Sequence, residues 1–220
     1  MVLVFSSGRS GTNLVLEMFT DHSMLTPSQY PEDKLLFKRD IMYPHTYLTK
    51  CDVVYVNGYD EFKRFMLKNK HCKVIWTVRH PFDWAMSKIY RGWGHAEDAT
   101  IHGCLDDLDY MYNLLQNVTG DFENRIIVTK MEKVLLDIES QAKLLCKFTK
   151  LPFEKSMLTP YKRMRHIGKR NRYKMLDKSQ IDLYKNWKSC YNGFFIKESI
   201  DLEYVFDNLM YLVNYLQYEV

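Results

Sequence analysis

The sequence predicts an α/β protein whose fold is a three-layer, doubly wound, mostly parallel sheet. Short apolar runs alternate along the chain with segments in which apolar residues recur at helical spacing, as in parallel sheets with helical crossovers. A turn rich in serine and glycine follows the first apolar run, where doubly wound sheets bind their ligands. A length of 220 residues suits one hydrophobic core, so we expect residues 1–220 to form a single domain.

Apolar runs predict the strands, and amphipathic segments predict the helices. The strands are expected at residues 2–5, 35–38, 53–56, 74–78 and 126–129. The helices are expected at residues 13–21, 60–69, 81–91, 105–117, 138–147 and 200–218. We expect the last helix to pack its apolar stripe against the domain, because few basic residues flank it for binding to a membrane.

The first predicted strand ends in a turn that reads Gly8-Arg9-Ser10-Gly11-Thr12. Glycine allows the backbone to turn tightly, and the first N–H groups of the helix that follows have no partner within that helix. The helix dipole favours negative charge at this point, and the arginine and hydroxyl side chains add further donors. The pattern therefore predicts a P-loop-like turn that binds a phosphate or sulfate group.

This turn differs from the nucleoside triphosphatase motif G-x-x-x-x-G-K-[ST]. Gly8 and Gly11 are only three residues apart, and Thr12 rather than a lysine follows Gly11. The lysine that reaches the outer phosphates and the hydroxyl that holds magnesium are therefore not in their places. A nucleotide or small-molecule kinase of the P-loop fold is accordingly the alternative interpretation, which magnesium-dependent ATP turnover would support.

A second anion site is predicted at the end of the apolar run 74–78. Arg79 follows this run directly, and Pro81 suits the first position of a helix that contains Ser87. The carboxyl ends of neighbouring parallel strands open on one crevice, so Arg79 could face the same ligand as the turn. An arginine fork and a hydroxyl would together bind a second, separate phosphate.

These two motifs resemble those of the sulfotransferase family that uses 3′-phosphoadenosine 5′-phosphosulfate (PAPS). The turn is similar to the family's P-K/R-S-G-T loop for the 5′-phosphosulfate. Arg79 and Ser87, eight residues apart with Pro81 between them, match the family's motif for the 3′-phosphate.

Two later segments extend the resemblance from about residue 2 to about residue 190. Residues 125–135 and 148–152 look like the family's strand, its "YEDL" segment and its "F-L-G-x-P" segment. Residues 167–170 resemble the late glycine-and-basic loop that closes over the nucleotide. Leu14 and Met131 stand where the family often has an aromatic residue and a tyrosine near the adenine.

The resemblance implies transfer of a sulfuryl group from PAPS, with 3′-phosphoadenosine 5′-phosphate (PAP) as product and no metal. It implies that Gly8, Arg9, Ser10, Gly11, Thr12 and Asn13 bind the 5′-phosphosulfate, with Arg9 also catalytic. It further implies that Arg79 and Ser87 bind the 3′-phosphate and that Gly168, Lys169 and Arg170 close over the nucleotide. The acceptor is expected to be a small molecule, a carbohydrate or a lipid, and a phenol or a peptide tyrosine fits equally.

The base that takes the acceptor's proton is predicted after the run 35–38. The sequence Lys38-Arg39-Asp40 looks like the family's "K-T-H" or "K-D" position, where a histidine or carboxylate faces the acceptor. Asp40 is the first candidate for this base, and Lys38 is expected to contact the sulfate. An aspartate that only caps a turn is an equally good interpretation of Asp40. Weaker candidates are His45, Glu17 and Asp83.

Charge is nearly balanced in this chain, although one segment is strongly basic. There are 31 basic and 27 acidic residues, a formal net charge of +4, which makes a general nucleic-acid role unlikely. Residues 162–174 are mostly cationic, which suits a loop that folds over a ligand with several negative charges. A solvated loop and a nucleic-acid-binding module are the other interpretations of this basic segment.

The cysteines predict the compartment and give no indication of a metal site. Five cysteines are scattered without a C-x-x-C pair, so we expect reduced thiols in a cytoplasmic protein. No apolar run is long enough to span a membrane. His95, His102 and Cys104 match no standard zinc spacing, so no metal site is predicted.

Overall fold

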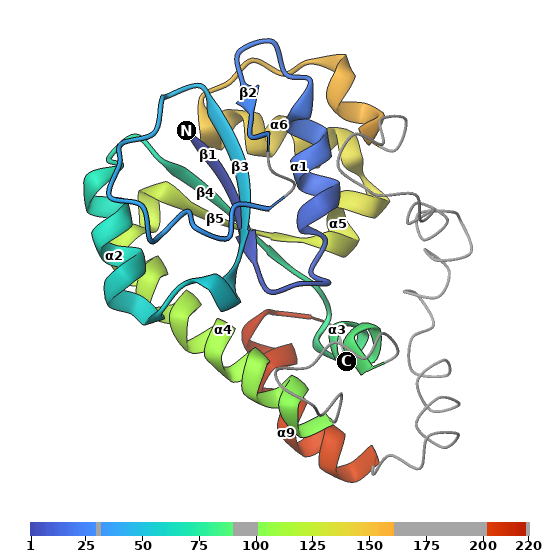
Figure 1. Ribbon diagram of the computed structural model, residues 1–220. Coiled ribbons are helices and arrows are strands. Elements are labelled where there is room, and N and C mark those ends of the chain that lie inside the picture. The colour runs from blue at the N-terminus through green and yellow to red at the C-terminus, as the bar shows by residue number, and fades with distance from the viewer. Residues whose placement is uncertain (30–31, 90–100, 161–201, 219–220) are drawn as a thin grey trace.

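The computed structural model describes residues 1–29, 32–89, 101–160 and 202–218, and Figure 1 shows how their helices and strands are arranged. The strands are β1 (Val2–Ser6), β2 (Thr26–Pro27), β3 (Tyr47–Asp52), β4 (Lys73–Val78) and β5 (Ile126–Lys130). The α-helices are α1 (Thr12–Thr20), α2 (Gly58–Lys68), α3 (Pro81–Ile89), α4 (Ile101–Phe122), α5 (Met131–Leu136), α6 (Ile138–Thr149) and α9 (Leu202–Tyr215). Short 3₁₀ helices are η1 (Val53–Tyr55), η2 (Glu123–Arg125) and η3 (Lys155–Leu158).

The strands form one parallel sheet in the order β2-β3-β1-β4-β5. In the centre, Val2 of β1 lies opposite Leu48 of β3 on one side and opposite Lys73 of β4 on the other. The chain leaves β1 towards β2 and β3 and then crosses to β4 on the other side of β1. The strand order therefore reverses between β1 and β4, and ligands of doubly wound sheets bind beyond the carboxyl ends of such a strand pair.

Alternating side chains of the buried strands supply two hydrophobic cores, one on each face of the sheet. The core shared with α2, α4 and α9 includes Phe5, Phe62, Trp76, Leu115 and Leu212. The core shared with α1 and α6 includes Val4, Val15, Phe19, Ile75 and Leu145. Helices thus cover both faces, and the predicted three-layer, doubly wound α/β fold is confirmed.

Most of the predicted elements lie where the sequence patterns place them. The strand predictions at residues 2–5, 74–78 and 126–129 correspond to β1, β4 and β5. The helix predictions correspond to α1, α2, α3, α4, α6 and α9, with ends that differ by a few residues. Residues 90 and 91 of the third predicted helix lie outside the described part of the chain.

Two strand predictions are wrong. Residues 35–38 form a turn, in which the N–H of Leu36 donates to the carbonyl of Asp33 (3.2 Å) and the N–H of Lys38 to that of Leu35 (3.1 Å). Leu36 and Phe37 are apolar because this turn covers the same core as α2. Covering the core requires buried side chains but no pairing with a strand. Residues 53–56 come after the strand: Val53–Tyr55 is η1, and the preceding Tyr47–Asp52 is β3.

Candidate functional site

The turn between β1 and α1 has a backbone that few residue types adopt. Arg9 and Gly11 both have positive φ values, 77° and 87°. Glycine takes this conformation at little cost, whereas an arginine there is uncommon and marks strain of the kind found at functional sites. A Cβ atom at Gly11 would also lie only 2.8 Å from Cγ of Met131, so position 11 accepts glycine alone without rearrangement.

The N-terminus of α1 has the features of an anion site. No side chain in the described residues caps this helix at Gly11, and its first turn contains no acidic residue. The Ser7 and Ser10 hydroxyls are fully buried beside this terminus and have no hydrogen-bond partner within the described part of the chain. A buried hydroxyl without a partner costs about 1–3 kcal/mol, which a bound anion would remove by accepting the hydrogen bond.

Arg79 follows β4 directly and is almost fully buried, with 8% of its surface exposed. Its Nε and Nη2 atoms each lie 3.2 Å from Oδ2 of Asp83, one turn further along in α3. Burial raises the pKa of the Asp83 carboxyl to about 6, and the Arg79 charge opposes this rise. Asp83 therefore fixes the guanidinium in part, and the planar fork of an arginine suits the binding of a phosphate.

A hydrogen bond connects the Arg79 side of this edge to the turn. The indole Nε1–H of Trp84, in α3, donates to the carbonyl oxygen of Gly8 at 2.9 Å. Trp84 itself is 1% exposed, so the contact is well shielded from water. The ends of β1 and β4 are neighbours in the sheet. The structure also brings the turn after β1 into direct contact with the helix that begins just after Arg79.

Residues on β5 and α5 complete the same edge of the sheet. Met131 packs against Gly11 of the turn. It stands where the family that the sequence resembles often has a tyrosine. The neighbouring Glu132 accepts a hydrogen bond of 2.7 Å from the backbone N–H of His80. Burial lowers the pKa of the His80 imidazole to about 4, and the positive charges of Arg79 and Lys130 lower it further.

For several other predicted site residues, the side chain or the whole residue lies outside the described part of the structure. Ser87 lies in α3, which begins two residues after Arg79, and the side chain of Ser87 is not among those described. Gly168, Lys169 and Arg170, with the rest of the basic segment 162–174, lie outside the described residues. Their assignments to the nucleotide stay predictions.

Asp40 lies at the other edge of the sheet. Its carboxylate and its carbonyl oxygen both accept hydrogen bonds from Nζ of Lys68, the last residue of α2. That end of α2 leads into the start of β4, and Tyr43 is bonded there to Asn69 (2.9 Å). The structure therefore does not bring Asp40 together with the turn, which follows the opposite ends of the strands.

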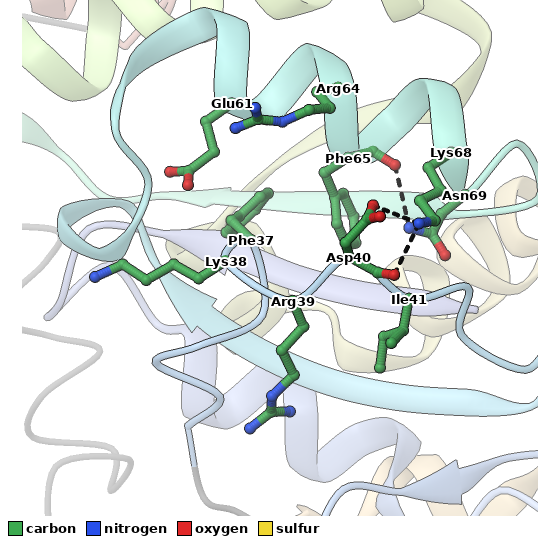
Figure 2. Close-up of a pocket in the computed structure, with 10 residues that line it drawn as sticks. All are labelled: Phe37, Lys38, Arg39, Asp40, Ile41, Glu61, Arg64, Phe65, Lys68 and Asn69. Carbon is green, nitrogen blue, oxygen red and sulfur yellow. Dashed lines mark hydrogen bonds and ion pairs between the residues drawn. The ribbon is translucent and has the colours of Figure 1, made fainter.

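Lys38 and Asp40 line a common hollow of about 480 Å³ between the 37–41 segment and α2 (Figure 2). The Lys38 side chain extends away from Lys68, towards the end of α2 that carries Glu61. That end of α2 is the one that follows β3, so Lys38 points towards the edge that carries the turn. The residues that line the hollow are Phe37, Lys38, Arg39, Asp40, Ile41, Glu61, Arg64, Phe65, Lys68 and Asn69.

No protein-family model and no curated protein matches this chain, whereas solved structures do. The sulfotransferase domain from the curacin biosynthetic pathway is 18% identical, with a TM-score of 0.72 over 100% of this chain and 98% of that domain. The sulfotransferase domain from the Synechococcus PCC 7002 olefin synthase is 14% identical, with a TM-score of 0.59 over 84% and 86% of the two chains. Mouse sulfotransferase SULT7A1, complexed with PAP, is 14% identical, with a TM-score of 0.50 over 74% of this chain and 63% of that one.

The chain has the fold of a sulfotransferase domain. Within the described part of this sulfotransferase fold, no group of three or more histidine, cysteine or acidic side chains is arranged to hold a metal ion. None of the helices searched there combines the length and the apolar composition needed to cross a bilayer.

Sequence reasoning missed some residues at the edge of the sheet that carries the turn. The sequence patterns predict no role for Trp84, Glu132 or Tyr218, although each contacts the turn or the residue after Arg79. Trp84 could have been found, because it falls on the first turns of the helix after Arg79, near the predicted crevice. Tyr218 carries no local signal, since only the fold brings the end of α9 to β5.

Proposed function

We propose that this protein transfers a sulfuryl group from PAPS to a hydroxyl or amine of a small-molecule, carbohydrate or lipid acceptor. One observation carries the proposal: two sites suited to anions lie at adjoining strand ends and are joined by the Trp84–Gly8 hydrogen bond. A nucleotide with phosphates on both its 5′ and 3′ positions has charged groups at two separate points, which suits such a pair of sites.

In this proposal the turn binds the 5′ end of the nucleotide. PAPS supplies the sulfuryl group, and negative charge grows on the leaving nucleotide during transfer. Arg9 and the N–H groups of Ser10, Gly11, Thr12 and Asn13 would stabilise that charge, together with the helix dipole of α1. The buried hydroxyls of Ser7 and Ser10 are consistent with this role, because each lacks a partner among the described residues.

Arg79 is proposed to bind the 3′-phosphate, with Ser87 as a second donor. Arg79 is buried at the end of β4, and its guanidinium has the planar set of N–H donors that binds a phosphate with two hydrogen bonds. Gly168, Lys169 and Arg170 are proposed to close over the nucleotide.

The acceptor side of the proposal is limited to Lys38. Its side chain extends along α2 towards the edge that carries the turn, which suits a contact with the sulfate. The position of Asp40, bonded to Lys68 at the other end of α2, argues against its use as the base. Another side chain is expected to take the acceptor's proton.

The test combines nucleotide binding with transfer of ³⁵S. Wild-type protein, Arg9→Ala and the exposed control Arg64→Ala are titrated with PAP by calorimetry and incubated with ³⁵S-PAPS and a panel of sugars, lipids and phenols. We expect wild type and the control to bind PAP and to label at least one acceptor. Arg9→Ala should lose roughly 10²–10³ in transfer rate, as when one donor to a developing oxyanion is removed. Failure to bind PAP, or magnesium-dependent ATP turnover instead, would contradict the proposal.

A further inference from the structure

The segment after α9 returns to the edge of the sheet that carries Arg79. Leu216 is buried in the core between the sheet and the α4 side. The side-chain Nζ of Lys130, the last residue of β5, donates to the carbonyl oxygen of Gln217. These contacts bring Tyr218 to the carboxyl ends of β4 and β5, which are distant from it in the sequence.

The ring of Tyr218 contacts two side chains of this edge. The Lys130 ammonium lies 4.2 Å from the ring centroid on one side, a cation–π contact. The His80 ring lies 4.9 Å from it at an interplanar angle of 64°. A tyrosine restrained in this way keeps its hydroxyl in one position.

That hydroxyl reaches the residue after Arg79 through a single carboxylate. The Tyr218 hydroxyl donates to Oε2 of Glu132 at 2.9 Å, and Oε1 of Glu132 accepts the backbone N–H of His80 at 2.7 Å. His80 directly precedes Pro81, the first residue of α3, so this N–H belongs to no helix and depends on Glu132. The bridge therefore restrains the backbone from which the Arg79 side chain projects.

The bridge also faces the charges around Arg79. Glu132 carries a negative charge close enough to raise the pKa of Asp83, the carboxyl partner of Arg79. Burial and the Glu132 charge in turn raise the pKa of Tyr218 well above its usual value, so the hydroxyl keeps the proton that it donates. A shift of Glu132 would thus change both the position and the electrostatic surroundings of the arginine.

We infer that Tyr218, acting through Glu132, is a positioning residue for the half of the nucleotide site that contains Arg79. Lys130, Glu132 and residues 216–218, here called the C-terminal latch, set the orientation of the guanidinium and thereby the preference for a nucleotide with a 3′-phosphate. This inference rests on the proposed function. We expect the turn after β1 to bind the 5′ end independently of Tyr218, because the ring and hydroxyl of Tyr218 contact Lys130, His80 and Glu132.

The test compares PAP with adenosine 5′-phosphate (AMP), which lacks the 3′-phosphate. Calorimetry gives the dissociation constants of both nucleotides for wild type, Tyr218→Phe, Glu132→Ala and Glu132→Gln. Tyr211→Phe is the matched control, since it removes a tyrosine hydroxyl of α9 that bonds to Asp109 of α4 instead. Circular dichroism and thermal melts of each variant confirm that it is folded.

Tyr218→Phe should raise the dissociation constant for PAP roughly fivefold to tenfold, the effect of one lost hydrogen bond, and change that for AMP less than twofold. Glu132→Ala should have a larger effect of the same kind. Glu132→Gln should recover part of the loss, because an amide can accept from His80 and donate to the Tyr218 oxygen. Tyr211→Phe should behave as wild type.

Three outcomes would overturn the inference in distinguishable ways. If wild type prefers PAP over AMP and Tyr218→Phe keeps the same preference, the latch does not position Arg79, and the proposed function stands. An equal loss of both nucleotides in Tyr218→Phe would show a merely structural role. If wild type binds neither nucleotide, the proposed function fails, and this inference fails with it.

Discussion

The two edges of the sheet contain charged side chains in very different surroundings. At the carboxyl edge, Arg79 and Asp83 form a pair whose side chains are 7% and 9% exposed. Beyond the amino edge, Asp40 and Lys68 also form an ion pair, but the Asp40 side chain is 90% exposed. Both pairs join an acidic and a basic residue, and the two pairs differ in how far they are buried.

This difference in burial indicates which charged residues are candidates for a function. Burying a charged pair costs several kcal/mol in desolvation, and a fold gains little stability from it. A buried pair at the edge of the sheet that also carries buried hydroxyls without partners among the described residues is therefore better explained by a ligand than by stability. The exposed pair can form and break in water at almost no cost, so its presence says little about function.

The largest expected effect comes from Arg79→Ala. Removing the buried guanidinium should weaken PAP binding by about 2–4 kcal/mol, because a charge-assisted phosphate contact is lost. AMP binding should change little, since AMP has no 3′-phosphate. Calorimetry with both nucleotides measures this, and Arg64→Ala, at an exposed arginine of α2, is the control. Unchanged PAP affinity in Arg79→Ala would remove the second phosphate site.

A medium effect is expected from the buried histidine at the same edge. His80 has a pKa of about 4 when folded and 6.5 ordinarily, so the unfolded chain takes up a proton first as the pH falls. The free energy of unfolding should therefore fall by about 1–3 kcal/mol between pH 6.5 and pH 4 on account of His80.

Comparison with His80→Gln isolates this contribution. The raised pKa of Asp83 acts in the opposite sense over a similar interval, because the folded state then binds the extra proton. Urea unfolding of both proteins at several pH values gives the difference between them, from which the Asp83 contribution largely cancels. Parallel pH curves would show that His80 is not held neutral by burial.

The smallest effect is expected at the amino edge. Asp40→Asn removes an exposed ion pair and should change the free energy of unfolding by less than about 0.5 kcal/mol. The rate of ³⁵S transfer should stay within about twofold of wild type. A loss of a hundredfold or more, with unchanged stability, would restore Asp40 as the base and overturn the contrast between the two edges.

The sequence was sufficient for the parts of the site that local patterns encode. The turn from Gly8 to Thr12 and the arginine after the run 74–78 carry their own signals, because each couples a strand end to a helix start. The sequence also indicated that both segments follow parallel strands of one sheet, although it did not give the full strand order. The structure places both beside the switch between β1 and β4.

The remainder depends on tertiary contacts that no local pattern encodes. Leu36 and Phe37 look like part of a strand because they are buried, yet they cover the core from a turn. That error moved the expected strand end to Lys38 and made Asp40 look like a residue at the crevice. Tyr218 reaches Glu132 across 86 residues, and only the path of α9 determines that contact.

The hydrogen bond from Trp84 to Gly8 gives this protein an optical reporter of its own. Indole fluorescence depends on the polarity and hydrogen bonding around the ring, and this indole is bonded to the backbone of the turn itself. Any ligand that shifts the Gly8 carbonyl should alter the emission of Trp84. Because the chain has four tryptophans, the signal of Trp84 is the difference in emission between wild type and Trp84→Phe. That difference follows occupancy of the turn in solution without a label and without knowledge of the acceptor.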